Sequence, residues 1–294
     1  MPRRKCIQIV RGQHAIDGAG VHLRRVLGLN TVKDFDPFLM LDGFDSTNPE
    51  DYIRGFPWHP HRGIETVTYL LKGEIDHGDS LGNHGTIRDN QCQWMTAGSG
   101  IIHQEMPQAS DRLSGCQLWV NLPKKYKMTQ PAYRDIKPQD VSVVQEKNAT
   151  IRVLSGNYHE HHGAVKGEYV KVQYLDITLP PDAVWHYQQT SNDQTLFLYL
   201  IEGTLAADDA LSDFEEKACA MLMSASSAKN SDYDEVLIKA GTEGARFFLL
   251  AAKPLMEPVA WGGPIVMNTK EELNEAFREL NNKTFIKHTR PQEL

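Results

Sequence analysis

The chain is poor in cysteine, has no long apolar run and has no excess of basic residues. Its four cysteines are scattered and form no CxxC pair, which argues against a disulfide framework and against a zinc knuckle. No run of eighteen apolar residues occurs, so no transmembrane helix is expected. The apolar stretch near the N-terminus is too short for a signal peptide. These absences predict an intracellular, cytoplasmic protein without a membrane partner.

The charge balance of the chain is acidic. Its 31 Lys and Arg residues are outnumbered by 38 Asp and Glu residues, and the net charge at pH 7 is −7. A chain of this charge has no basic field to attract nucleic acid. Its one basic cluster, Arg3-Arg4-Lys5, is interpreted as a solvated terminal tail. We therefore expect no direct nucleic-acid partner.

Short runs of β-forming residues, broken by Gly, Asp, Asn and Pro, are spread along the 294 residues. Such regularly spaced strands are typical of a sandwich or a barrel. Segments 66–75 and 195–205 share a pattern of aromatic, aliphatic, charged and glycine residues, which a duplicated barrel would explain. The polar segment 124–150 indicates a linker that contains at most a strand or two. The sequence thus predicts an all-β chain of two antiparallel barrels, residues 1–135 and residues 136–294.

One helix is predicted near the C-terminus, over residues 268–282. Thr269 can cap its first turn, and Glu272 follows three residues later, which together predict a capping box. Apolar residues recur at helical spacing on one face. They are Leu273, Ala276, Phe277 and Leu280. We expect this helix to dock on a barrel.

Two pairs of potential metal ligands stand out in the N-terminal half. His59 and His61 are two residues apart, and so are His103 and Glu105. On a strand, side chains two residues apart point to the same face. If the two strands are neighbours, the pairs present three imidazoles and one carboxylate to a shared space. The alternative is that the imidazoles are barrel residues hydrogen-bonded to the backbone. Burying this set together is costly unless a cation pairs with the carboxylate, so we expect a metal.

The donor set narrows the identity of the metal. Calcium and magnesium prefer oxygen ligands, and the lack of a thiolate disfavours a structural zinc site. Three imidazoles and a carboxylate suit Fe, Mn, Co, Ni or Cu, with positions left for substrate or dioxygen, and Fe(II) is ranked first. Glu65 is an alternative, either as a ligand in place of Glu105 or as an acceptor that orients an imidazole N–H. His77 and His84 lie in a segment rich in Gly and Asp that is interpreted as a surface turn.

At these residues the sequence resembles the pirin family of the cupin superfamily, over about residues 5 to 285. The resemblance is carried by segments 35–42, 55–57, 59–63, 65–67, 93–98, 100–107, 117–122 and 263–269. It implies a bicupin, with two jelly-roll β-barrels packed side by side. It also implies that the N-terminal barrel holds one metal through His59, His61, His103 and Glu105, and it disfavours Glu65 as a ligand.

The C-terminal half departs from the metal-binding pattern. The strand predicted around Val184 to Gln188 has one histidine where an HxH pair would be needed. We expect this barrel to be free of metal. The neighbouring residues His159, His161 and His162 lie in a polar loop and are interpreted as surface residues.

The resemblance implies a choice between two functions. Some pirin-like proteins resemble quercetin 2,3-dioxygenases, which cleave the central ring of a flavonol with dioxygen and release carbon monoxide. Others act as iron-dependent coregulators that bind a partner protein. We expect the dioxygenase, with the non-enzymatic regulator as the alternative. A cupin isomerase or a sugar-binding cupin is a third class.

In the enzyme, Glu105 would act as the general base toward the flavonol 3-hydroxyl, whose pKa a metal lowers. A flat aromatic substrate also needs an apolar pocket. Five residues near the ligand segments are candidate walls of this pocket. They are Phe44, Phe56, Trp58, Trp94 and Met95.

Overall fold

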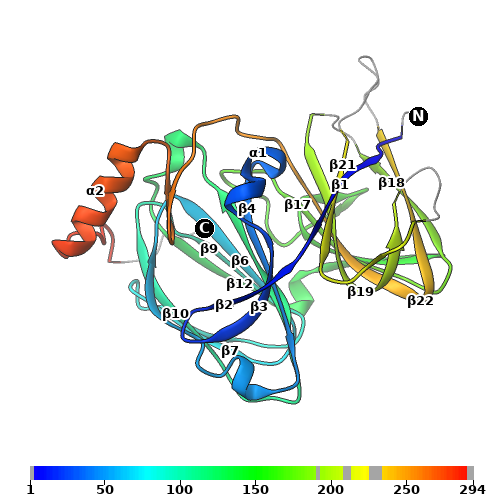
Figure 1. Cartoon of the computed structure of the whole chain (residues 1–294), viewed down its shortest axis with the longest axis horizontal. Coiled ribbons are helices and arrows are strands. Elements are labelled where there is room, and N and C mark those ends of the chain that lie inside the picture. Colours follow the sequence, from blue (N-terminus) through cyan, green and yellow to red (C-terminus); the bar gives the residue numbers. More distant parts are fainter. Residues whose placement is uncertain (1–2, 190–192, 208–212, 225–233, 290–294) are drawn as a thin grey trace. The chain divides into compact units, whose positions relative to one another are not determined.

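The computed structural model describes residues 3–189, 193–207, 213–224 and 234–289, and most of the regular structure in these ranges is β-strand (Figure 1). The contacts between residues divide the chain into two compact units. Residues 13–32, 38–138 and 255–294 form the first unit, here termed the first barrel. Residues 1–12, 33–37 and 139–254 form the second barrel. The prediction of an all-β chain with a helix near its C-terminus is confirmed.

The first barrel contains two larger antiparallel sheets and one short hairpin. The larger sheet has the strand order β12 (Ala132–Ile136), β9 (Gln91–Thr96), β6 (Ile64–Lys72), β11 (Leu113–Asn121), β4 (Phe38–Ser46), β3 (Val21–Leu27) and β2 (Gln13–Asp17). The smaller sheet has the order β5 (Phe56–His61), β10 (Ile101–Pro107), β7 (Ile75–Asp79) and β8 (His84–Ile87). The hairpin pairs β23 (Ala260–Gly262) with β24 (Ile265–Met267). Apolar side chains from both sheets and from the hairpin share one core cluster, which includes Met95, Ile101 and Val266.

The second barrel is built on one antiparallel sheet. Its main strand order is β1 (Cys6–Arg11), β21 (Cys219–Met223), β19 (Thr195–Ala206), β22 (Asp234–Ala252), β17 (Gln173–Leu179), β14 (Ala149–Ser155) and β13 (Ser142–Glu146). Strand β18 (Val184–Gln189) pairs with β22, β20 (Glu215–Glu216) pairs with β19, and β15 (Asn157–Tyr158) pairs with β16 (His161–His162). Its interior is filled by apolar and aromatic side chains such as Trp185, Tyr187 and Phe247.

Helical structure is limited in the described ranges. The α-helices are α1 (Val32–Phe35) and α2 (Lys270–Asn281), and the 3-10 turns are Leu29–Thr31, Pro49–Asp51, Lys124–Tyr126 and Pro138–Asp140. The predicted linker therefore carries regular structure, since β12 pairs with β9 and β13 pairs with β14. The repeated pattern also has a structural counterpart. Strands β6 and β19 are each flanked on both sides, and Gly73 and Gly203, which end the two motifs, both have a positive φ that favours glycine.

The expected division was into residues 1–135 and residues 136–294. In the structure, each end of the chain belongs to the other barrel. Strand β1 pairs with β21 and so belongs to the second barrel, whereas residues 255–294 group with the first. The interpretation of Arg3-Arg4-Lys5 as a solvated tail is wrong for Arg4. Its side chain is buried. Its Nε donates to Asp234 Oδ2 at 3.0 Å, and its Nη1 donates to the carbonyl of Gln194 at 2.9 Å.

The predicted capping box of helix α2 is present. Thr269 Oγ1 accepts the backbone N–H of Glu272 at 3.2 Å, and Glu272 Oε2 accepts the N–H of Thr269 at 3.0 Å. Replacing Thr269 by alanine is expected to destabilise the helix by about 1 kcal/mol, because a backbone N–H at its start loses its acceptor. Hydrogen exchange of the amides in the first turn measures this as faster local opening, and Thr269→Ser is the control. Unchanged exchange in Thr269→Ala would contradict the assignment.

Candidate metal centre

The two predicted ligand pairs lie on neighbouring strands. β5 and β10 run antiparallel, with His61 opposite Ile101 and His59 opposite His103. Buried and half-buried residues alternate along β10, and both His103 and Glu105 are on its buried face. The strand periodicity used to group each pair is therefore present in the structure.

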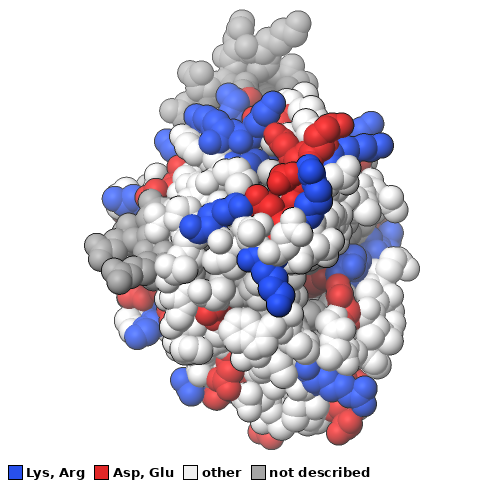
Figure 2. Space-filling view, turned by 90° about the vertical axis from the view of Figure 1, so that its left-hand side faces the viewer, with Lys and Arg blue, Asp and Glu red and all other residues white. Residues whose placement is uncertain are grey.

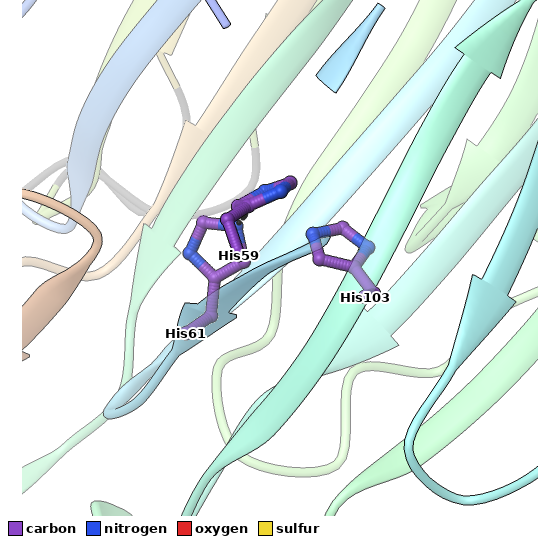
Figure 3. Close-up of side chains that lie close together, drawn as sticks. All are labelled: His59, His61 and His103. Carbon is purple, nitrogen blue, oxygen red and sulfur yellow. Dashed lines mark hydrogen bonds between the residues drawn. The ribbon is translucent and has the colours of Figure 1, made fainter. Parts of the chain in front are cut away.

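Three imidazole rings converge at this point of the first barrel. The ring centroid of His59 lies 4.8 Å from that of His61 and 4.4 Å from that of His103, and the remaining pair is 4.9 Å apart. One potential ligand atom from each residue lies within 4.8 Å of the other two. Figure 3 shows the rings turned toward one another, two from one strand and one from the next. Among the described residues this is the only group of three His, Cys, Asp or Glu that meets this criterion.

Backbone carbonyls fix the tautomers of two of these rings. His59 Nδ1 lies 2.9 Å from the carbonyl oxygen of Pro57, and His61 Nδ1 lies 3.1 Å from that of Pro264. A carbonyl can only accept, so each Nδ1 carries a proton, and in the neutral form of each ring the lone pair is on Nε2. Carbonyl partners of this kind are usual for histidines that bind metals.

The two Nε2 atoms face each other at a distance of 3.1 Å. Two imidazole nitrogens this close need a proton or a metal ion between them, because two lone pairs would repel. Nitrogen ligands at neighbouring positions of an octahedral ion lie about 3 Å apart, given a metal–nitrogen distance of about 2.1 Å. The side chains present therefore fit a divalent transition metal.

The electrostatics of the site keep the two buried rings, those of His61 and His103, neutral. Burial, with a contribution from His59, lowers the pKa of His61 to about 3. Burial, with contributions from the neighbouring histidines, also holds the pKa of His103 well below its ordinary value. Both nitrogens of the His103 ring are buried without a hydrogen-bond partner among the described residues. Neutral imidazoles with free lone pairs are the form that binds a metal.

Glu105 lies on the same strand face but is held by other side chains. Its Oε1 accepts hydrogen bonds from Thr68 Oγ1 at 3.0 Å and from Gln117 Nε2 at 3.0 Å, and Gln117 Nε2 also lies 2.8 Å from Oε2. Gln117 is oriented in turn by the indole N–H of Trp119, 3.2 Å from its Oε1. Glu105 is not one of the three converging residues. Its role as the fourth ligand therefore stays a prediction.

The remaining candidate ligands are not among the three converging residues. Glu65 lies on β6, in the other sheet, and its Oε1 accepts a hydrogen bond from Thr96 Oγ1 at 2.7 Å. The surface interpretation of His77 is wrong, because its side chain is fully buried, whereas His84 is exposed. In the second barrel, His159 and His162 are exposed and His161 is half-buried.

A cavity of about 640 Å³ opens onto the centre. Its polar wall contains His59, His61 and Glu105, with Thr68 and Gln117 beside them. Its apolar wall contains aromatic and aliphatic side chains from several strands and from the C-terminal segment. They are Met40, Phe44, Phe56, Trp119, Trp261 and Pro264. The volume suits an aromatic ligand of a few rings.

Two of the five predicted pocket residues, Phe44 and Phe56, line this cavity, and three do not. Trp58 is 52% exposed on the opposite face of β5, as expected for the residue just before His59. Trp94 and Met95 are buried on β9, and Met95 packs in the core. Sequence reasoning missed Trp119, because its segment, residues 117–122, indicates the family and carries no pattern that marks a pocket wall. It also missed Trp261, which is distant in sequence and carried no signal.

The surface charges are mixed. Figure 2 shows Lys and Arg interspersed with Asp and Glu on one face, together with large uncharged areas. No helix among the described residues is long and apolar enough to cross a membrane.

Two cupin barrels, one of which carries a converging histidine group beside a cavity, define the chain as a bicupin. Its sequence matches the family described as Pirin over residues 20–120 and the Pirin C-terminal cupin domain over residues 174–286. It is 41% identical to a Pseudomonas aeruginosa protein provisionally named a quercetin 2,3-dioxygenase, over 94% of this chain and 96% of the relative. It is 40% identical to a pirin-like protein of Caulobacter vibrioides, over 97% and 100% of the two chains. The chain belongs to the pirin family.

A solved structure supports the same fold. The crystal structure of a quercetin 2,3-dioxygenase from Acinetobacter baumannii superposes with a TM-score of 0.86 at 30% sequence identity. The match covers 96% of this chain and 98% of that one. The predicted bicupin architecture and the resemblance to pirins are thus confirmed.

Proposed function

We propose that this protein is a metal-dependent dioxygenase that cleaves a flavonol such as quercetin with dioxygen. The observation that carries the proposal is the convergence of three imidazoles, with the Nε2 atoms of His59 and His61 3.1 Å apart, beside a cavity whose wall also contains Glu105. The names of the Pseudomonas and Acinetobacter relatives support the choice of substrate. Fe(II) is the favoured metal, with Ni, Co, Mn and Cu as alternatives.

In the proposed enzyme, one group of residues would bind the metal and another would bind the substrate. His59, His61 and His103 would hold the metal, with Glu105 as the fourth ligand. A divalent metal bound there would supply Lewis-acid stabilisation of a substrate oxygen. Phe44, Phe56 and Trp119 are the walls against which a flat ring system would pack. They would orient it and exclude water.

Glu105 is proposed as the general base as well. Its carboxylate borders the cavity and accepts hydrogen bonds from Thr68 and Gln117. It would accept the proton of the flavonol 3-hydroxyl when the substrate enters. Thr68 and Gln117 would keep the carboxylate oriented toward that hydroxyl.

Turnover of quercetin tests the proposal. The purified protein is loaded separately with Fe(II), Ni, Co, Mn and Cu, and the loss of quercetin absorbance is followed under air. At least one metal is expected to support turnover, and His59→Ala is expected to lower kcat/KM by at least about 100-fold because a ligand to the metal is lost. His84→Ala, which alters an exposed histidine of β8, is the matched control.

If no metal supports turnover of quercetin, the proposed dioxygenase activity is wrong. Metal binding that is retained in that case and still depends on His59 would favour the alternative, a non-enzymatic, iron-dependent regulator that binds a partner protein.

A further inference from the structure

One histidine of the centre lacks the support that the other two have. His59 and His61 each donate a ring N–H to a backbone carbonyl. The side chain of His103 is fully buried, and neither of its nitrogens has a hydrogen-bond partner among the described residues. Only one of these nitrogens can face the shared centre. The other carries a proton that needs an acceptor, because leaving a buried N–H unpaired is costly.

A second buried histidine lies next to this ring. His77 is on β7, which pairs with β10 so that His77 is opposite Glu105 and Asp79 is opposite His103. The side chain of His77 is fully buried, and its ring packs against Tyr133 at 4.7 Å between centroids. Its Nε2 lies 3.3 Å from Asp79 Oδ2. Its Nδ1 has no hydrogen-bond partner among the described residues.

The partners of Asp79 determine which nitrogen of His77 carries the proton. Asp79 accepts the backbone N–H groups of Leu81 at 2.9 Å and Asn83 at 3.0 Å, and the side-chain amide of Asn83 at 2.8 Å. Three such donors hold the side chain as a carboxylate, which can only accept. His77 therefore donates from Nε2, and in the neutral form of the ring its Nδ1 is left as an acceptor without a donor.

The two unsatisfied rings are complementary and correctly spaced. The centroids of His77 and His103 are 5.4 Å apart. An N–H···N hydrogen bond of about 3 Å between two imidazoles separates their centroids by roughly 5 Å. A small rotation of either ring would therefore join a donor on His103 to the acceptor on His77.

We propose that His77 and Asp79 are positioning residues for the metal centre. The three side chains would form a hydrogen-bonded relay. The ring N–H of His103 that faces away from the metal donates to His77 Nδ1, and His77 Nε2 donates to Asp79. The relay fixes the tautomer and the ring orientation of His103, as the carbonyls of Pro57 and Pro264 do for the other two histidines. The inference rests on the metal centre proposed above.

Ni(II) affinity tests the relay on the full chain, by competition with a chelator at constant pH. His77→Phe keeps the ring packing against Tyr133 but removes the acceptor, and Asp79→Asn keeps the size of Asp79 but presents a donor to His77. Each is expected to weaken Ni(II) binding about 10- to 100-fold, the usual effect of losing such a supporting partner. Tyr133→Phe is the matched control, since it keeps the ring against His77 and removes only the hydroxyl, whose hydrogen bonds go to Gln93 and Asp135, and it is expected to bind as wild type.

Nitrogen-15 NMR of histidine-labelled, metal-free protein gives a readout that a merely structural role would not move. The Nδ1 of His77 is expected to be unprotonated in the wild type and protonated in Asp79→Asn. Folded His77→Phe protein that binds Ni(II) within twofold of wild type would overturn the relay, as would a protonated Nδ1 in the wild type. If His77→Phe does not fold, the affinity and spectrum of Asp79→Asn decide. Ni(II) binding that survives His59→Ala would instead overturn the centre itself.

Discussion

Replacing Glu105 by glutamine is expected to lower kcat for quercetin by about 10²- to 10⁴-fold, the range over which a general base usually contributes. The amide cannot accept the proton of the flavonol hydroxyl. It would also bring an NH₂ group close to the amide of Gln117, which donates to both carboxylate oxygens in the wild type. Gln117 cannot flip without cost, because its own oxygen accepts the indole N–H of Trp119. Steady-state kinetics with the activating metal measure the loss.

Ni(II) binding by the same variant separates the two proposed roles of Glu105. If the carboxylate is both ligand and base, Ni(II) affinity falls together with kcat. If it acts only as base, kcat falls while the affinity set by the three histidines is kept. Glu74→Gln, at an exposed carboxylate that pairs with Arg88, is the control and is expected to leave both unchanged. A Glu105→Gln enzyme with wild-type kcat would exclude Glu105 as the general base.

The histidine group was predictable because it depends on strand periodicity, which a sequence displays directly. His59 and His61 share a face, and His103 lies on the buried face of its own strand. The acceptors behind the rings were not predictable, because any residue carries a backbone carbonyl. Pro264 reaches His61 from 203 positions away in the chain, and no side-chain pattern marks it.

The walls of the cavity were predicted only in part, because local irregularities decide them. Phe56 and His59 are three residues apart, so regular alternation would place them on opposite faces of β5. They lie opposite Glu105 and His103, which are two residues apart, and the register shifts between these pairs. This bulge brings Phe56 to the cavity while Trp58 stays outside. The burial of His77 was missed for a related reason, since a polar segment resembles a surface turn even when one side chain points inward.

Arg62 connects the C-terminal segment of the first barrel to the candidate metal centre. The buried guanidinium of Arg62 donates to the carbonyls of Ser99 at 2.6 Å and Phe285 at 2.9 Å. It also lies 2.7 Å from Glu279 Oε2 and 4.1 Å from the centroid of the Phe285 ring. Arg62 directly follows His61, whose Nδ1 donates to Pro264 in the same C-terminal segment. One side chain therefore anchors the segment that fixes the tautomer of a proposed ligand.

Replacing Arg62 by alanine is expected to lower the free energy of unfolding by about 3 kcal/mol, because it leaves two carbonyls without their donor and leaves the half-buried carboxylate of Glu279 with Lys287 alone. Denaturant unfolding of the full chain measures the loss. Hydrogen exchange should locate it in α2 and the residues that follow. Arg278→Ala, at an exposed arginine of the same helix, is the control and is expected to change stability by less than about 0.5 kcal/mol. A loss below about 1 kcal/mol in Arg62→Ala would show that the segment is held mainly by its apolar contacts.

The ion pair between Arg62 and Glu279 should also make the stability depend on pH. Although burial alone would raise it, the pKa of Glu279 is lowered from its ordinary value of 4.5, because Lys287 and Arg62 stabilise the carboxylate. A carboxyl whose pKa is lower in the folded state adds stability that is complete above its unfolded-state pKa and is lost as the pH falls through the folded-state value. The difference in unfolding free energy between wild type and Arg62→Ala should therefore be constant near neutral pH and shrink below pH 4.5. A difference that does not change with pH would assign the stabilisation to the carbonyl and ring contacts of Arg62, which do not titrate.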